Sequence, residues 1–240
     1  EMLRSLVGSE MCIRDSYRLI ALAPASVQEM ADFVGIAFDL AFKYRNPAII
    51  LADGVIGQMM EKVVLPEQRT RLTDEEVIAR CPWATTGRTH HRTPNIITSL
   101  ELDPAEMEKR NIHLQKKYAE IEENEVRFEE LHCEDAEYLI VAFGSCARIA
   151  QKAMEMAREE GIKVGLLRPI TLWPFPSKAI AARAAQVKGI LTVELNAGQM
   201  VEDVRLAVEC KVPVEHFGRL GGIVPDPDEV ITALKEKLIK

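Results

Sequence analysis

The sequence lacks any pair of cysteines at Cys-x-x-Cys spacing, although it contains five cysteines in 240 residues. We therefore expect neither an iron–sulfur cluster nor a zinc knuckle on this chain. The odd count in a long chain also argues against a disulfide scaffold, so a reducing cytoplasm is the expected environment. Outside the first residues, the cysteines are interpreted as small apolar residues: Cys81, Cys133, Cys146 and Cys210.

Long apolar runs and an excess of basic residues are also missing. No run approaches the roughly 18 uncharged apolar residues of a membrane helix. The formal net charge is −7, which argues against nucleic acids and anionic membrane surfaces as partners. A hydrophobic content of 48% with 28% charged residues is typical of a globular protein of one or two domains.

The first 16 residues differ from the rest of the chain. Glu10, Arg14 and Asp15 interrupt any apolar core, so the segment is not a signal peptide. Residues 6–16 match the translation of a common transposase library adaptor. We expect residues 1–16 to be a foreign leader, and the native sequence to start at Tyr17.

Residues 17–65 show a strand, helix, strand pattern. The apolar run 17–23 is followed by Ser26 and Glu29 at capping-box spacing. Helical spacing then continues to residue 44, with an apolar stripe expected along one side: Val27, Met30, Val34, Phe38 and Ala41. Residues 48–52 are wholly apolar and predict a parallel strand covered on both faces.

Residues 66–131 predict a connection rather than a core. Polar residues and prolines dominate up to residue 97, with a short helix expected at 73–80. Asp103 and Pro104 then predict the start of a charged helix running to about residue 128. Its thin apolar stripe favours a surface or bridging position. Connections of this length are usually functional or form interfaces.

Residues 132–240 predict a complete small α/β domain. Four apolar strands are expected at 138–143, 164–167, 190–195 and 212–217, alternating with helices at 145–160, 177–187, 196–209 and 226–239. Residues 168–176 are expected to be a rigid loop. Asn196 is expected to cap the third of these helices.

Several motifs resemble one family. They are LAPASVQEM at 22–30, KYRNP at 43–47, LADGVIGQMME at 51–61, PWATTG at 82–87, NIHLQKKY at 111–118, IEENE at 121–125, RPITLWPFP at 168–176 and VELNAGQM at 193–200. Together they resemble the alpha-type subunit of thiamine-dependent 2-oxoacid:ferredoxin oxidoreductases. The branch most similar is the 2-ketoisovalerate type, and the 2-oxoglutarate type is the nearest rival.

The resemblance implies an α/β fold in two parts. Residues 17–65 would be the C-terminal part of an incomplete thiamine-pyrimidine-binding-type domain, and residues 132–240 a complete transketolase C-terminal-like parallel α/β domain. Between them, residues 66–131 would be a connecting loop and charged helix. The family's alpha subunit begins well upstream of Tyr17, so we expect a truncation that removes its catalytic residues.

The resemblance also implies the chemistry. Such enzymes decarboxylate a 2-oxoacid on thiamine diphosphate, pass the acyl group to coenzyme A and send electrons to ferredoxin. Thiamine diphosphate and Mg²⁺ would be shared with a thiamine-binding beta subunit. Iron–sulfur clusters would lie on other chains, among gamma and ferredoxin-like subunits. We expect the isolated fragment to hold no cofactor and to be inactive.

No catalytic or metal-binding residue is predicted. Asp53 and Gly54 follow a parallel strand, where α/β sheets bind ligands, and are the candidates for cofactor binding, although a capping turn also explains them. Gly144 and Ser145 could present a helix N-terminus to an anion, or form a plain turn. Residues 218–222 could cradle phosphate or form a packed turn.

Other polar residues have simpler interpretations. His90 and His91 suggest metal, but adjacent side chains rarely bind one ion, so a solvated loop is expected. The glutamate pairs at 122–123 and 129–130 are expected on a solvated helix face.

Two alternatives to the enzyme subunit stay open. One is a catalytically inert structural or interaction fragment. The other is the similar domain pair of a transketolase or of a 2-oxoacid dehydrogenase E1 beta chain; the loop at 82–87 and the charged helix argue against it.

Overall fold

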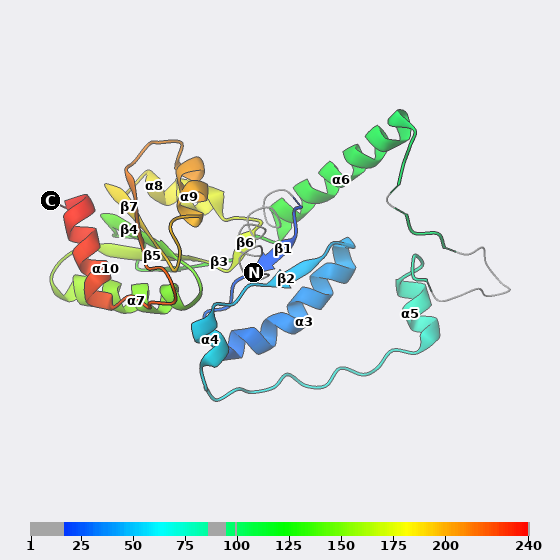
Figure 1. The fold of residues 1–240 in the computed structure, drawn as a ribbon, viewed down its shortest axis with the longest axis horizontal. Coiled ribbons are helices and arrows are strands. Elements are labelled where there is room, and N and C mark those ends of the chain that lie inside the picture. The colour runs from blue at the N-terminus through cyan, green and yellow to red at the C-terminus, as the bar shows by residue number, and fades with distance from the viewer. Residues whose placement is uncertain (1–16, 86–94, 99, 240) are drawn as a thin grey trace. The chain divides into compact units, whose positions relative to one another are not determined.

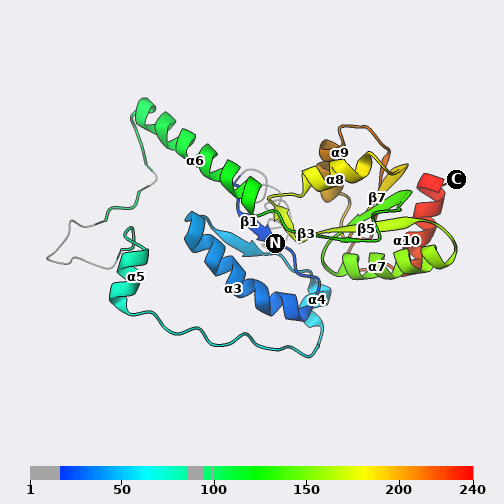
Figure 2. The same ribbon diagram turned by 180° about the vertical axis from the view of Figure 1, so that it is seen from behind.

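A computed structural model of the chain describes residues 17–85, 95–98 and 100–239. The expected leader, as well as His90 and His91, lie outside the described residues. The chain divides into two compact units, one formed by residues up to Leu65 and from Lys117 onward, the other by Pro66–Lys116. Within the first unit, two sheets define a first and a second lobe (Figures 1 and 2).

The first lobe is built on the predicted βαβ segment. Strand β1 (Ile20–Leu22) pairs in parallel with β2 (Ala48–Ile50), and helix α3 (Val27–Tyr44) connects them. The Ser26 hydroxyl caps α3 by accepting the Glu29 N–H at 3.1 Å, and the Glu29 carboxylate accepts the Ala25 N–H at 2.7 Å. A short helix, α4 (Gly54–Gln58), follows β2.

Two predictions about this lobe are wrong. The buried face of α3 consists of Phe33, Ala37, Leu40 and Tyr44, whereas Val34 and Phe38 of the predicted stripe are exposed. Strand β2 is half-buried rather than covered on both faces. The third strand of the sheet, β6 (Thr171–Trp173), pairs antiparallel with β1. It comes from residues predicted to be a loop.

The core of the first lobe joins residues that are far apart in sequence. Ile20, Leu40, Tyr44, Ile121 and Trp173 pack in one cluster, and Ile121 is fully buried. Ile121 lies on helix α6 (Pro104–Asn124), which ends earlier than the predicted residue 128. Burial of these large apolar groups stabilises the lobe at roughly 25 cal/mol per Å².

The second lobe contains the predicted α/β domain. Its four parallel strands are β4 (Tyr138–Ala142), β5 (Val164–Pro169), β7 (Gly189–Glu194) and β8 (Val214–Gly218). An edge strand, β3 (Phe128–Leu131), pairs antiparallel with β5. The spatial order is β3-β5-β4-β7-β8. Strand β3 was not predicted, because its sequence Phe-Glu-Glu-Leu reads as a continuation of the charged helix.

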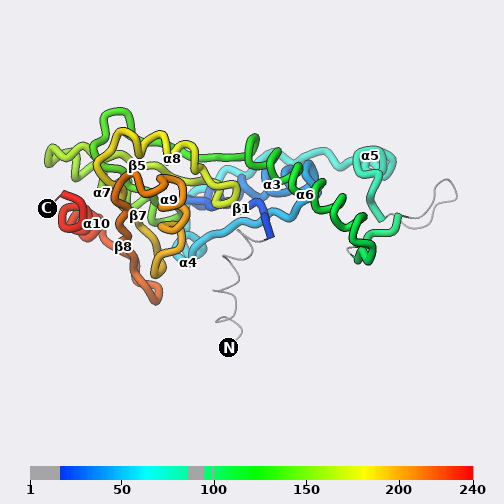
Figure 3. Tube along the Cα trace, turned by 90° about the horizontal axis from the view of Figure 1, so that it is seen from above, coloured from blue at the N-terminus to red at the C-terminus, as the bar shows by residue number. Residues whose placement is uncertain are grey.

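Helices cover both faces of this sheet. Helices α7 (Gly144–Glu159) and α10 (Pro227–Leu234) pack on one face, and α10 lies beside α7 when seen from above (Figure 3). Helices α8 (Ser177–Ala184) and α9 (Met200–Val208) pack on the other. A π-helical turn (Lys235–Ile239) follows α10. The mixed α/β fold with a parallel sheet is therefore confirmed.

The second unit has little core. Helix α5 (Asp74–Arg80) begins with the predicted capping box, in which Thr73 and Glu76 exchange hydrogen bonds, but it buries no residue. Among the described residues from 57 to 120, none is buried. Large apolar side chains here are instead exposed, among them Ile96, Ile97, Leu100 and Leu102. In the part of the chain that the structure describes, no helix is long and apolar enough to span a membrane.

Candidate functional site

The parallel sheet of the second lobe has a topological switch point between β4 and β7. From β4 the chain crosses through α7 to β5 on one side, and later returns through α8 to β7 on the other. Open α/β sheets bind their ligands in the crevice outside the carboxyl ends of the strands at such a point. This crevice is the candidate functional site.

A cavity of about 220 Å³ lies in the crevice. Residues after β4 and β7 contribute to its wall, and so does the turn that follows β2 of the first lobe. The lining residues are Leu51, Ala52, Asp53, Phe143, Gly144, Cys146, Glu194, Leu195, Asn196 and Gln199. The switch point therefore lies where the two lobes meet.

The side-chain carboxylate of Asp53 lies at the N-terminus of helix α7. One carboxylate oxygen, Oδ1, accepts the N–H groups of Val55 and Ile56 at 3.0 Å and thereby caps α4. The other, Oδ2, accepts the Ser145 N–H at 2.8 Å, across 92 positions of sequence. The predicted capping turn is confirmed, and the same carboxylate also supplies the anion at the helix N-terminus formed by Gly144 and Ser145. A cofactor-binding role for Asp53 and Gly54 stays a prediction.

Gly144 makes this contact possible. Its φ of +61° lies in the left-handed region, and a Cβ atom there would come within 2.8 Å of Asp53 Oδ2. Only glycine combines this backbone conformation with so close an approach. Gly54, the other predicted candidate glycine, has open space around its Cα, and a side chain there would meet nothing within 4 Å.

Glu194 is a second carboxylate in the crevice, and no sequence pattern identified it. Its side chain is fully buried at the end of β7. It accepts the N–H groups of Gln199, Met200 and Val201 at 2.8–3.1 Å and thereby caps α9. Asn196, the predicted cap, instead accepts the Gly198 N–H. The sequence signal that could have identified Glu194 is its position as the one charged residue of a predicted strand.

The charge of Glu194 is stabilised by its surroundings. Burial alone raises the pKa of Glu194, but hydrogen bonds from His216 and from the three backbone N–H groups bring that pKa below its ordinary value. The His216 Nδ1 atom lies 3.4 Å from Glu194 Oε1. The helix N-termini on both sides of the crevice are thus neutralised by the protein's own carboxylates.

Two further ion pairs join the lobes. Glu61, after α4, pairs with Arg148 of α7 at 2.6 Å, and this contact is the main reason why the pKa of Glu61 is lowered. Glu29 of α3 pairs with Arg168, whose side chain is only 9% exposed. Arg168 also pairs with Glu129 at 3.0 Å.

The prediction that Glu129 and Glu130 lie on a helix is wrong. They lie on strand β3, not on a solvated helix face, and each pairs with an arginine: Glu129 with Arg168, and Glu130 with Arg183 at 2.6 Å. The glycine segment at 218–222 fits the packed-turn interpretation at its start, since a Cβ on Gly218 would lie 2.2 Å from the Asn196 carbonyl oxygen.

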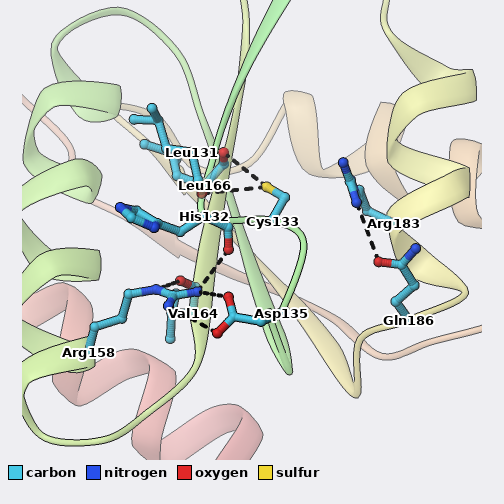
Figure 4. Close-up of polar contacts among 9 residues, drawn as sticks. All are labelled: Leu131, His132, Cys133, Asp135, Arg158, Val164, Leu166, Arg183 and Gln186. Carbon is cyan, nitrogen blue, oxygen red and sulfur yellow. Dashed lines mark hydrogen bonds and ion pairs between the residues drawn. The ribbon is translucent and has the colours of Figure 1, made fainter.

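Among the described cysteines, the two buried ones lack the environment of a nucleophile. Figure 4 shows the Cys133 thiol directed at the carbonyl oxygens of Leu131 and Leu166, at 3.6 and 3.3 Å, while the His132 ring points away. Burial raises the pKa of Cys133 to about 11 and that of Cys146 to about 12. Cys210 is a free, exposed thiol.

The switch-point crevice does not fit a thiamine diphosphate or its Mg²⁺. The helix N-termini that could receive a diphosphate at the switch point already hold the Asp53 and Glu194 carboxylates. In the described ranges, no three His, Cys, Asp or Glu side chains are grouped so that they could hold a metal ion. No catalytic step is therefore assigned to residues of this crevice.

Comparison with known proteins gives two family matches. Residues 8–131 match the model described as pyruvate flavodoxin/ferredoxin oxidoreductase, thiamine diphosphate-binding. Residues 136–230 match pyruvate:ferredoxin oxidoreductase core domain II. The boundary falls between β3 and β4, so Asp53 and Ser145 belong to different matched regions.

Curated relatives agree with these matches. The chain is 46% identical over 221 residues to ketoisovalerate oxidoreductase subunit VorB of Methanothermobacter marburgensis, covering 92% of this chain and 61% of the relative. It is 32% identical over 213 residues to 2-oxoglutarate synthase subunit KorA of Archaeoglobus fulgidus, covering 88% of this chain and 59% of the relative. The chain thus spans about three fifths of the length of these relatives.

A solved structure supports the fold. It is the 2-oxoglutarate:ferredoxin oxidoreductase from Magnetococcus marinus with 2-oxoglutarate, coenzyme A and succinyl-CoA bound. The TM-score is 0.69 with 23% sequence identity, over 90% of this chain and 42% of that chain. At this identity the likeness concerns the fold alone.

Proposed function

Because the chain belongs to the pyruvate flavodoxin/ferredoxin oxidoreductase family, we propose that it is part of a thiamine-dependent 2-oxoacid:ferredoxin oxidoreductase. The enzyme oxidatively decarboxylates a 2-oxoacid to an acyl-CoA and passes two electrons to ferredoxin. The observation that carries this proposal is the family match over more than half of the chain, residues 8–131.

The substrate we propose is 2-ketoisovalerate. The chain is 46% identical to the ketoisovalerate oxidoreductase subunit and 32% identical to a 2-oxoglutarate synthase subunit over a similar length. The difference of 14 percentage points favours the branched-chain acid. The second candidate is 2-oxoglutarate, which the relatives at 30–32% identity support.

We further propose that other chains supply the cofactor sites. Thiamine diphosphate and Mg²⁺ would be held with a thiamine-binding beta subunit, and iron–sulfur clusters by gamma and ferredoxin-like subunits. The occupied helix N-termini at the switch point support this division. The compartment we propose is the cytoplasm.

The role of the isolated chain is a separate proposal. By itself the 240-residue chain would be an inert structural piece, whose three carboxylates connect the lobes. Incubating it with thiamine diphosphate, Mg²⁺, coenzyme A, 2-ketoisovalerate and a viologen dye is expected to give no dye reduction. Reduction above the rate without protein would contradict that proposal.

Reconstitution tests the function itself. The chain, extended to the length of its relatives, would be coexpressed with a beta and a ferredoxin-like chain and purified through a tag on the chain. We expect a stable complex that reduces ferredoxin with 2-ketoisovalerate at a higher kcat/KM than with 2-oxoglutarate. A complex that prefers 2-oxoglutarate would support the second candidate, and absence of both partner binding and turnover would exclude the proposal.

A further inference from the structure

The outer side of helix α3 carries an apolar stripe that is not buried in the first lobe. Val34 and Phe38, one turn apart, are 47% and 63% exposed, although Phe33 and Leu40 on the adjacent side of the helix are buried. Three more apolar residues share the flank of Val34 and Phe38 and are only partly buried: Met30, Ala31 and Ala41. We call these five residues the α3 stripe. An apolar stripe of this width is typical of a helix that packs against another element.

The charged flank of α3 faces the other way. Lys43 pairs with Glu125, which follows α6, at 2.7 Å, and Glu29 pairs with Arg168, which lies just before β6. These contacts direct the charged flank toward β6, the strand that pairs with β1 on one side. Strand β2 pairs with β1 on the other side, so the α3 stripe lies on the β2 side of the helix.

Strand β2 is an open sheet edge on this same side. The sheet order is β2-β1-β6, so among the described strands β2 pairs with β1 alone. The Leu51 N–H donates to the Leu22 carbonyl oxygen at 2.8 Å. Because successive N–H groups of a strand point to opposite sides, the Ile50 N–H points away from β1. Residues 48–52 contain no charged residue and no proline, the features that usually protect an open edge from pairing. The edge of β2 is therefore suited to receive another strand.

The open edge and the α3 stripe together specify the kind of partner. Parallel strands are connected through helices, and these helices cover the faces of the sheet. A strand added in parallel to β2 would therefore bring a helix that lies beside α3, over the stripe. The relatives have the length for such a segment. The chain covers 61% of the ketoisovalerate oxidoreductase subunit, so about two fifths of that relative lies outside the match.

We propose that the β2 edge and the α3 stripe form one docking surface, whose occupant is a strand–helix segment from the part of the subunit that lies outside the matched region. The strand of that segment pairs with β2, and its helix packs on Val34 and Phe38. The proposal also explains the two wrong predictions about this lobe, because the stripe and strand β2 are covered only when the segment is present. It does not depend on the substrate or the reaction, so it can fail while the proposed function stands.

Thiol labelling tests the helix side of the docking surface. Phe38→Cys places a reporter in the α3 stripe, and Asp32→Cys places a matched control on the exposed polar side of the same helix. Each variant would be made in the 240-residue chain and in the chain extended to the length of its relatives, and labelled with iodoacetamide before peptide mapping. We expect labelling of Phe38→Cys to slow by at least about ten-fold in the longer protein, and labelling of Asp32→Cys to stay unchanged.

Hydrogen exchange tests the strand side without any substitution. The Ile50 amide should exchange rapidly in the 240-residue chain and be protected in the longer protein, whereas the Leu51 amide, which bonds to Leu22, should be protected in both. Equal labelling of Phe38→Cys in the two proteins, or equal exchange at Ile50, would overturn the proposal. Protection that rises with the concentration of the 240-residue chain would indicate a second copy as the occupant, and protection that requires an added beta chain would indicate that subunit; either result would overturn the proposal as well.

Discussion

Replacing Glu194 by glutamine is expected to destabilise the second lobe strongly. The buried carboxylate accepts three backbone N–H groups at the start of α9 and contacts His216. Glutamine keeps the size, but it loses the charge and turns an NH₂ group toward backbone donors. Loss of an N-cap costs about 0.5–2 kcal/mol, and hydrogen bonds to charged groups contribute about 1.5–3 kcal/mol. We expect a loss of about 2–3 kcal/mol.

The assay is denaturant unfolding followed by far-UV circular dichroism, with Glu202→Gln as the matched control. Glu202 lies in the first turn of the same helix and is exposed, so its replacement should change the free energy of unfolding by less than about 0.5 kcal/mol. Equal effects of the two replacements would refute the assignment of Glu194 as the cap of α9.

The effect of Glu194→Gln should also depend on pH. The folded-state pKa of Glu194 is lowered, so its carboxylate contributes stability that is fully present above the unfolded pKa of about 4.3. That contribution is lost as the pH falls through the folded-state pKa. The difference between wild type and variant should therefore stay constant from pH 7 to about pH 5 and shrink at lower pH. A difference that grows on acidification would contradict the sign of the shift.

Three further predictions concern other parts of the molecule. Ile121→Ala should cost about 2–5 kcal/mol in chemical unfolding, because Ile121 is fully buried in the first-lobe core, whereas Ile112→Ala on the exposed side of the same helix should be nearly neutral. At pH 8, iodoacetamide followed by peptide mapping should label exposed Cys210 before Cys133 and Cys146, whose thiols are buried with pKa values of about 11 and 12; early labelling of either buried thiol would disprove this order. Brief trypsin treatment should cut at Arg71 or Arg80, since no described residue from 57 to 120 is buried, and first cuts within the second lobe would contradict that expectation.

Local signals predicted much of the fold. The four parallel strands of the second lobe are short apolar runs separated by helices, and Ser26, Thr73 and Asp103 each accept a backbone N–H at the predicted helix starts. Both features depend on neighbouring residues only. For this reason the class and the order of the elements could be read from the sequence.

Contacts between residues far apart in the sequence could not be predicted from these local signals. Strand β6 forms because Trp173 and Thr171 meet β1, some 150 positions earlier in the chain. Helix α3 is apolar around more than one side, so periodicity could not decide whether Phe33 or Phe38 faces the core. The partner of Asp53 at the N-terminus of α7 is equally remote. Asp53 was predicted as a residue at a strand end, but its contact with Ser145 was not.

The most direct measurement of how the crevice is built is a double-mutant cycle of Asp53→Ala and Gly144→Ala. The methyl group of Gly144→Ala would collide with Asp53 Oδ2 at 2.8 Å, and this collision disappears when Asp53 is also replaced. We predict that the free-energy loss of the double variant is smaller than the sum of the two single losses by at least about 1 kcal/mol. Additive losses would show that the two residues do not meet and would contradict the contact of Asp53 with the N-terminus of α7.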